Sequence, residues 1–172
     1  MVLSDDELDR LRAACDTLMR RAMLEVLAST GCYLPDLVAI ERADVDLSGC
    51  TVRVGRGRHS HLADLSPEAA DAVARYLKSR LDDHNPLLFV RENRPIGPQS
   101  RTNALHHLKR VQAEAGVEGD LVKRLRMTVA FQHWRGGITS RELAQVMGIA
   151  RKTAEGYGTG FRHLWRSGVR WP

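Results

Sequence analysis

The amino-acid sequence predicts a mainly α-helical α+β domain that carries a small antiparallel sheet near its middle. Apolar residues recur every three or four positions along most of the chain, which is the period of an amphipathic helix. Between residues 45 and 65 this period is lost, and β-branched residues are interrupted by glycine-containing turns, which is typical of hairpin strands. Serine or proline stands where several helical patterns begin, as helix-capping residues do.

The first forty residues predict three helices. Ser4 and Glu7 form a capping-box pattern, and apolar residues then follow at helical spacing to residue 18. A second helix is expected over residues 19–29 and stops at Gly31. Pro35 predicts the first turn of a third helix, because proline is tolerated at that position.

Residues 45–65 predict a three-stranded antiparallel sheet. A turn at 47–50 leads into a strand at 51–54, and a second turn at 55–58 leads into a strand over about 60–65. The second turn is strongly basic, so this hairpin is expected to present positive charge at its tip.

The remainder of the chain predicts further helices around one short extended segment. Ser66 and Pro67 start a helix that runs to about residue 81, a short buried strand or extended segment is expected at 87–90, and residues 95–98 are expected to form a loop. Helices follow at about 99–115, 123–135 and 139–147. The pattern from residue 151 allows a helix, but its three alternating glycines each disfavour helix by about 1 kcal/mol.

Length and composition fit one globular domain, which we expect to span residues 1–172. No apolar run approaches the roughly 20 residues that cross a bilayer, and the acidic start of the chain does not resemble a secretory signal. Cys15, Cys32 and Cys50 have neither metal-ligand nor disulfide spacing. Reduced thiols in a cytoplasmic protein are therefore expected.

Charge is distributed unevenly along the chain. The formal net charge is −5 over residues 1–50, +2 over residues 51–122 and +8 over residues 123–172. A basic third of this kind suits a polyanion such as nucleic acid, although basic surfaces also occur in proteins that bind none.

The order of these elements, and motifs placed along it, resembles the catalytic domain of tyrosine recombinases of the phage-integrase type. Fourteen residues separate Lys123 from Gly137 and eleven separate Gly137 from Gly148, which matches the family pattern. The motifs that carry the resemblance are LSDDE at 3–7, TGCYLPDL at 30–37, DVD at 44–46, VGRGR at 54–58, LS at 65–66, LRMT at 125–128 and VMGI at 146–149. The resemblance covers nearly the whole chain and implies the tyrosine-recombinase catalytic-domain fold. The family's N-terminal core-binding domain has no counterpart, so either the natural protein lacks it or the chain is a fragment of a longer recombinase.

Enzymes of the family that this sequence resembles attack a DNA phosphate with a tyrosine and form a 3′-phosphotyrosine link without a metal. Two arginines, a hairpin lysine and two histidine-like residues face the phosphate oxygens, and arginine suits this task because its planar fork donates two hydrogen bonds. The resemblance therefore implies double-stranded DNA as the partner, with no cofactor and no metal.

Only part of the family's catalytic set is present. Arg126 matches the second arginine, and Lys123 takes the position of the first histidine, where it remains a cation. Tyr33 takes the position of the first arginine and supplies no charge, and Ile149 takes that of the second histidine or tryptophan and can donate nothing. If the chain cleaves DNA, the catalytic candidates are Arg126, Lys123 and Tyr157.

Two further positions depart from the family pattern. Spacing from residue 149 places the nucleophile at Gly158, whereas the tyrosine is Tyr157, and one residue along a helix turns a side chain by about 100°. The hairpin lysine has no direct equivalent, so Arg56, Arg58 or His59 would have to replace it.

The missing groups favour a DNA-binding protein whose catalysis is impaired or lost, with a regulatory or architectural role. An active site-specific recombinase is the alternative, and a protein-interaction module with an incidental basic face is a third hypothesis. The residues predicted to contact DNA are Arg53, Arg56, Arg58, His59, Lys123, Arg124, Arg126, Arg151 and Lys152. Such a protein is expected in the cytoplasm, associated with the nucleoid.

Three smaller patterns have alternative interpretations. Residues 139–153 also resemble a helix-turn-helix, and this interpretation likewise places Arg151 and Lys152 near DNA. His106 and His107 lie on a helix without ligand spacing and are interpreted as structural. The aromatic and basic C-terminal tail either docks in a neighbouring protomer, which would give a homo-oligomer, or packs on the core of its own chain; its aromatic residues are Phe161, Trp165 and Trp171.

Overall fold

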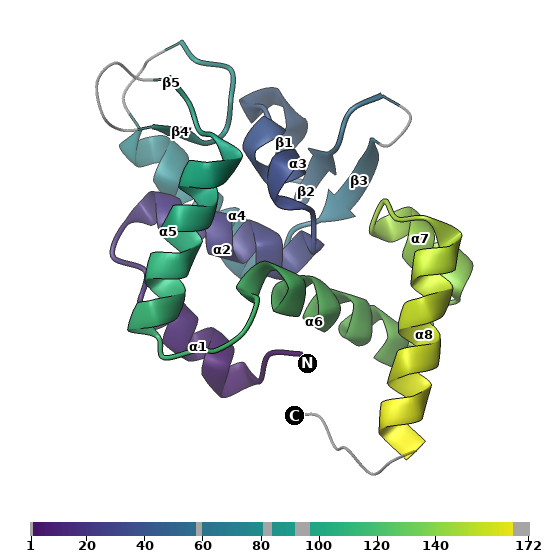
Figure 1. Cartoon of the computed structure of the whole chain (residues 1–172). Coiled ribbons are helices and arrows are strands. Elements are labelled where there is room, and N and C mark those ends of the chain that lie inside the picture. Colours follow the sequence, from purple (N-terminus) through teal and green to yellow (C-terminus); the bar gives the residue numbers. More distant parts are fainter. Residues whose placement is uncertain (1, 58–59, 81–83, 92–96, 167–172) are drawn as a thin grey trace.

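The computed structural model describes residues 2–57, 60–80, 84–91 and 97–166, and Figure 1 gives the arrangement of the elements. Within these ranges the chain is mainly helical with a small antiparallel sheet, which confirms the predicted fold class. The helices are α1 Asp5–Ala13, α2 Leu18–Thr30, α3 Leu34–Ala39, α4 Pro67–Ser79, α5 Arg101–Glu114, α6 Leu121–Arg135, α7 Ser140–Val146 and α8 Arg151–Arg166, with a 3-10 turn η1 at Arg42–Asp44. The strands are β1 Val45–Asp46, β2 Thr51–Val54, β3 His61–Asp64, β4 Val90–Arg91 and β5 Gly97–Pro98.

The helices begin where the capping residues predict. The Ser4 hydroxyl accepts from the Glu7 amide at 3.1 Å, and the Glu7 carboxylate accepts from the Ser4 amide at 3.0 Å, so the capping box is formed. The Ser66 hydroxyl caps α4 by accepting from the Ala69 amide at 3.1 Å, with Pro67 in the first turn. Helix α2 ends at Gly31, whose φ of 60° is the left-handed conformation that glycine adopts without steric cost.

The strands β1, β2 and β3 form the predicted three-stranded antiparallel sheet, in that order. Val52 and Val54 of β2 are fully buried while Arg53 between them is exposed, because successive side chains of a strand point to opposite faces. The turn between β1 and β2 is held by the Asp46 carboxylate, which accepts from the amides of Ser48 and Gly49 at 3.0 and 2.9 Å.

One detail of the sequence prediction was wrong, and the structure decides one possibility that the sequence left open. The segment expected as a loop at 95–98 contains β5, which pairs antiparallel with β4. The segment expected as a short buried strand or extended segment at 87–90 is a strand at Val90, which continues to Arg91 in β4. A two-residue pair is too short to leave a periodic pattern in the sequence. The C-terminal helix α8 runs without a break through its three glycines, because its apolar face packs on α6 and this packing outweighs the low helix propensity of glycine.

The core consists of two clusters. The larger one surrounds α2, which Figure 1 places between α4, α5 and α6, and it includes the buried faces of β2 and β3. The smaller one joins α6, α7 and α8 and includes Val2 from the start of the chain. No helix in the described ranges has the length and apolar character needed to cross a membrane.

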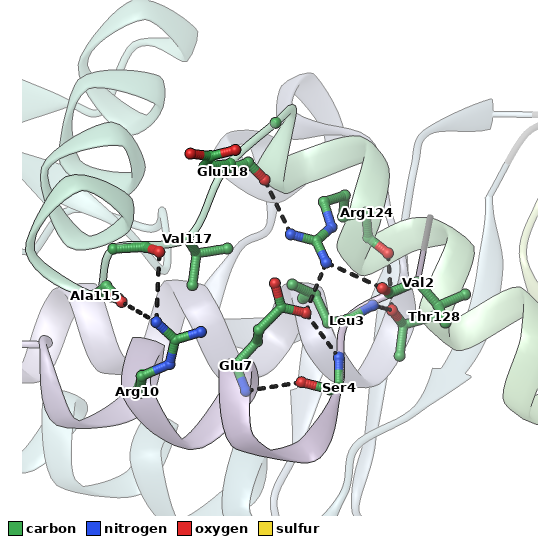
Figure 2. A network of polar contacts seen from close by, with 12 residues as sticks. Val2, Leu3, Ser4, Glu7, Arg10, Ala115, Val117, Glu118, Arg124 and Thr128 are labelled. Atoms are coloured by element: carbon green, nitrogen blue, oxygen red, sulfur yellow. Dashed lines mark hydrogen bonds and ion pairs between the residues drawn. The ribbon is translucent and has the colours of Figure 1, made fainter. Parts of the chain in front are cut away.

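The start of the chain is attached to α6 by a polar network, drawn in Figure 2. The Leu3 amide donates to the Thr128 hydroxyl at 2.8 Å, and the Arg124 guanidinium donates to the Val2 carbonyl at 3.1 Å. Arg124 also forms an ion pair with Glu7 at 2.6 Å, and this contact lowers the pKa of the Glu7 carboxyl from its ordinary value. The network fixes the N-terminal segment and α1 against the helix that carries Lys123 and Arg126.

Candidate active site and nucleic-acid interface

Arg126 is buried at the centre of the candidate site, with 5% of its surface exposed. It lies on α6 and donates one hydrogen bond from Nη1 to the carbonyl of Gly31, at the end of α2. Its Nε and Nη2 atoms are buried and have no hydrogen-bond partner. An unsatisfied buried donor costs about 1–3 kcal/mol, and more when it is charged, so an acceptor that reached these nitrogens would be strongly favoured.

Tyr33 covers the Arg126 guanidinium. The central carbon of the guanidinium lies 3.6 Å from the centre of the tyrosine ring, which is a cation–π contact. Tyr33 is the N-cap residue of α3, immediately beyond the Gly31 turn, and half of its surface is exposed. Tyr33, which the sequence analysis assigned to the position of the family's first arginine, therefore supplies an aromatic face and no guanidinium.

A pocket of about 360 Å³ opens beside this pair. Lys123, Arg126 and Tyr157, the three catalytic candidates, all line it, so the fold brings together residues from α6 and α8. Arg101, at the start of α5, also lines the pocket and was not predicted as a site residue. No sequence signal distinguishes Arg101 from other arginines that follow a helix cap.

A second pocket, of about 250 Å³, lies where Tyr33 and Arg126 meet β3 and the turn after α7. His61 reaches over this turn, and a Cβ placed on Gly148 would clash with the His61 ring. The φ of +59° at Gly148 also favours glycine there. Burial raises the pKa of the Cys32 thiol in this pocket to about 11, so the thiol is protonated at neutral pH and is a poor nucleophile.

Tyr157 is half-buried on α8, and its ring stacks on that of Phe161 at 6.0 Å between ring centres. The helix is regular through residues 157 and 158, so the neighbouring glycines do not unwind it. Gly158, where the family spacing places the nucleophile, is buried near Ser140 and Trp134. Tyr157 nevertheless lines the same pocket as Arg126.

The hairpin residues differ in how their charges are used. Arg53 is exposed on β2. Arg56 forms ion pairs with Glu41 at 2.9 Å and with Asp44 at 2.8 Å, so two carboxylates compensate its charge. Arg58 and His59 lie outside the described residues.

Arg124 is not among the residues that line either of these two pockets, and its side chain is engaged in the network of Figure 2. Its side chain is only 12% exposed and also donates to the Glu118 carbonyl at 2.9 Å. Its predicted role in DNA binding stays a prediction, and the structure gives it a role in holding the N-terminal segment.

Arg151 and Lys152 are exposed at the start of α8, where the helix dipole adds positive potential. Arg151 pairs with Glu155 at 2.9 Å, but both side chains are more than half exposed, so the pair contributes little. Helices α7 and α8 pack on each other across a short turn, in agreement with the two-helix pattern seen in the sequence.

The histidine pair on α5 has no features of a metal site. Nδ1 of His107 accepts a hydrogen bond from Arg20 at 3.1 Å, and burial lowers the pKa of this histidine. Within the described ranges, no group of three histidine, cysteine, aspartate or glutamate residues could hold a metal ion.

Comparison with known proteins decides the family. The model of the phage integrase family matches residues 1–154. The chain belongs to the phage integrase family. The tyrosine recombinase XerD of Neisseria meningitidis serogroup B (strain ATCC BAA-335 / MC58) is 28% identical over 182 residues, covering 98% of this chain and 61% of that protein. XerA of Thermococcus kodakarensis is 29% identical over 150 residues, covering 85% of this chain and 53% of that protein.

Solved structures agree with this assignment. A crystal structure of XerA recombinase superposes with a TM-score of 0.82 at 25% identity, covering all of this chain and 66% of that one. XerH recombinase in a post-cleavage complex with its difH substrate has the same fold, with a TM-score of 0.78 at 16% identity, and the match covers 98% of this chain and 53% of that one. This chain spans 61% of the length of its XerD relative.

Two residues that the sequence analysis singled out, Ile149 and Phe161, contribute to packing in the structure. Ile149 is half-buried against the cluster formed by α6, α7 and α8. Phe161, the first aromatic residue of the C-terminal tail, is buried in that cluster and stacks edge-on with Phe131 at 5.3 Å. The side chain of Trp165, and Trp171, lie outside the described residues.

Proposed function

We propose that this chain is a DNA-binding domain of tyrosine-recombinase fold whose cleavage activity is impaired, and that it acts as a regulatory or architectural factor. The observation that carries the proposal is the state of Arg126. Its guanidinium lines a pocket and keeps two nitrogens without a hydrogen-bond partner, which supports an anion site there. Tyr33 lies on this guanidinium, and at the positions that the sequence analysis assigned to family donors Tyr33 and Ile149 supply no charge.

Double-stranded DNA is the polyanion that best fits this chain. The last 50 residues carry a net charge of +8, and Arg53, Lys123 and Lys152 are exposed cations. XerH recombinase and λ integrase, which share the fold, were each solved bound to DNA. We expect the protein to act in the cytoplasm, on the nucleoid.

The loss of donors supports impaired catalysis. A single preorganised donor aimed at developing negative charge is worth about 10²–10³ in rate, and losses within one catalytic unit do not multiply. Lys123 remains as a cation, so phosphate binding is expected to survive better than cleavage.

Binding is tested by titrating a fluorescent duplex of random sequence at several salt concentrations. We expect affinity that falls steeply with salt, with a slope reduced by about 0.9 for each phosphate contact that a variant loses. The variants are Lys123→Ala and an Arg151→Ala/Lys152→Ala double change, and Arg135→Ala is a matched exposed control on α6. Absence of binding even at low salt would refute the proposal and favour a protein-interaction module.

Cleavage is tested with a nicked duplex that traps the covalent intermediate. We expect no SDS-resistant adduct above the background of Tyr157→Phe. An adduct that forms with the unaltered chain and disappears in Tyr157→Phe would establish the alternative, an active recombinase that uses Tyr157, Arg126 and Lys123.

We also propose that the C-terminal tail mediates a homo-oligomer. Support comes from its composition, which combines Trp171 with Arg166 and Arg170. Sedimentation of the whole chain and of a chain ending at residue 166 should give different masses, and equal masses would refute this contact.

A further inference from the structure

The wall of the 360 Å³ pocket combines cations, which suit a phosphate, with aromatic and aliphatic surface, which a phosphate does not need. Three cations line it, Arg101, Lys123 and Arg126, against one carboxylate, Asp120. The Asp120 carboxylate is occupied in capping α6, where it accepts from the Lys123 amide at 3.0 Å. The positive charge of the pocket is therefore only partly compensated.

The rest of the wall is aromatic and aliphatic. Tyr33 and Tyr157 supply rings, and Leu34, Pro35, Leu105 and Val122 supply aliphatic surface. A phosphate alone gains nothing from such a surface, because it is strongly hydrated and has no apolar part. A ligand that fills the pocket must join an anion to a flat, weakly polar group.

Tyr33 is arranged to receive such a group. The Arg126 guanidinium lies on its ring at 3.6 Å, yet half of the residue remains exposed. A planar base could stack on the exposed side of the Tyr33 ring. The guanidinium, the tyrosine ring and the base would then form one stack. The same exchange of arginine for tyrosine that removes a phosphate donor thus creates a stacking surface.

We propose that this pocket binds one nucleotide unit, with its phosphate on Arg126 and Lys123 and its base stacked on Tyr33. The proposal rests on the proposed function, because the nucleotide is expected to belong to a DNA strand. The pocket volume lies at the small end of the range for ligand sites, about 300–1,000 Å³, which suits a single nucleotide. Bases inside a duplex are stacked, so the site selects an unpaired nucleotide, for which the cost of extrusion is lowest.

The test compares two duplexes with the same number of phosphates. One carries a single bulged deoxyadenosine, and the other carries a bulged abasic deoxyribose at the same position. We expect the base to improve affinity by about 5- to 150-fold, the range that corresponds to one stacked base, about 1–3 kcal/mol. Equal affinities for the two duplexes would overturn the proposal.

Variants of Tyr33 separate stacking from folding. Tyr33→Phe keeps the ring and should keep the preference for the base, whereas Tyr33→Leu keeps an apolar cover without a ring and should abolish it. Lys123→Ala should weaken both duplexes by the same factor. A preference for the base that persists in Tyr33→Leu would overturn the role of Tyr33.

A second experiment separates failure of the nucleotide site from failure of DNA binding, and it tests whether the ligand is a free nucleotide. If neither duplex nor the random-sequence DNA binds, the proposed function fails, and dAMP is titrated against deoxyribose 5-phosphate. Tighter binding of dAMP that requires the ring of Tyr33 would support the nucleotide site with a soluble nucleotide as its ligand. Equal binding of the two compounds, or none, would overturn it.

Discussion

Arg124 and Arg126 illustrate how neighbouring arginines acquire different roles. Two residues apart on α6, they project about 200° from each other around the helix, since each residue turns by about 100°. Arg126 enters the pocket and Arg124 holds the N-terminal segment. Both were predicted to contact DNA, Arg126 from the LRMT motif and Arg124 as one of the neighbouring cations, and the motif alone did not show that Arg124 is used inside the fold.

The first prediction concerns Arg124. Arg124→Met should lower the free energy of unfolding at pH 7 by about 1–3 kcal/mol, because Glu7 and two carbonyl oxygens lose a charged donor. Lys123→Met, a neighbouring exposed change, should stay within about 0.5 kcal/mol. Urea unfolding of the three proteins provides the measurement.

The same substitution should alter the pH dependence of stability. Arg124 lowers the pKa of Glu7 below its ordinary value of 4.5, so the pair stabilises the fold above that pH and loses its effect as the pH falls toward the lowered value. The stability of Arg124→Met should therefore decline less between about pH 6 and about pH 3, pH values chosen about 1.5 units to either side of the ordinary carboxyl value. Parallel declines in the two proteins would contradict this account of the ion pair.

At the scale of the element, α8 shows packing overriding propensity. Ala154, Gly158 and Phe161 are buried at spacings of four and three residues, so one face of the helix lies against α6 and α7. Gly156 and Gly160 lie on the exposed side, where a Cβ would meet no atom within 4 Å. These two glycines therefore lower the stability of the helix without a structural need for either.

The second prediction follows from this difference among the glycines. Gly156→Ala and Gly160→Ala should each raise the free energy of unfolding by about 0.5–1 kcal/mol, since alanine loses less conformational freedom. Gly148→Ala is the contrasting control, and it should destabilise because φ is +59° and the new Cβ would clash with His61. The melting temperatures should be higher than that of the unaltered chain for Gly156→Ala and Gly160→Ala, and lower for Gly148→Ala. A lower melting temperature for both helix variants would contradict this prediction.

For the whole molecule, the division of the core into two clusters matters most. Helix α6 contributes Leu121 and Leu125 to the cluster around α2, and Val129 and Phe131 to the cluster around α7 and α8. The second cluster is much smaller, so α7 and α8 are held by less buried apolar surface than α2. Lys152 and Tyr157 therefore belong to the less strongly held part of the fold.

The third prediction is that α7 and α8 open separately from the rest. Their amides should exchange with deuterium faster than those of α2, because local opening requires the loss of the smaller cluster only. Val2→Ala should accelerate exchange in α7 and α8 with little change in α2, whereas Val73→Ala in α4 should accelerate exchange throughout. Uniform exchange in α2 and α8 would mean that the domain opens as one unit.

The sequence by itself determined the local structure and the family. Helix starts at Ser4 and Ser66, the helix end at Gly31 and the central hairpin depend on interactions within a few residues, so they leave recognisable patterns. The motifs along the chain were sufficient to identify the phage integrase family. The short pair of β4 and β5 left no such pattern, and the pattern from residue 151 allowed α8 without deciding whether it forms.

Only the tertiary structure decided what each side chain does. Arg126 meets a carbonyl 95 positions away at Gly31, and Arg124 meets a carboxylate 117 positions away at Glu7. Tyr33 became a cover for Arg126, and Arg56 became the partner of two carboxylates. Burial and pairing depend on residues that are distant along the chain and adjacent only after folding, so charge and spacing can nominate a cation but cannot say whether it faces a ligand or another part of the protein.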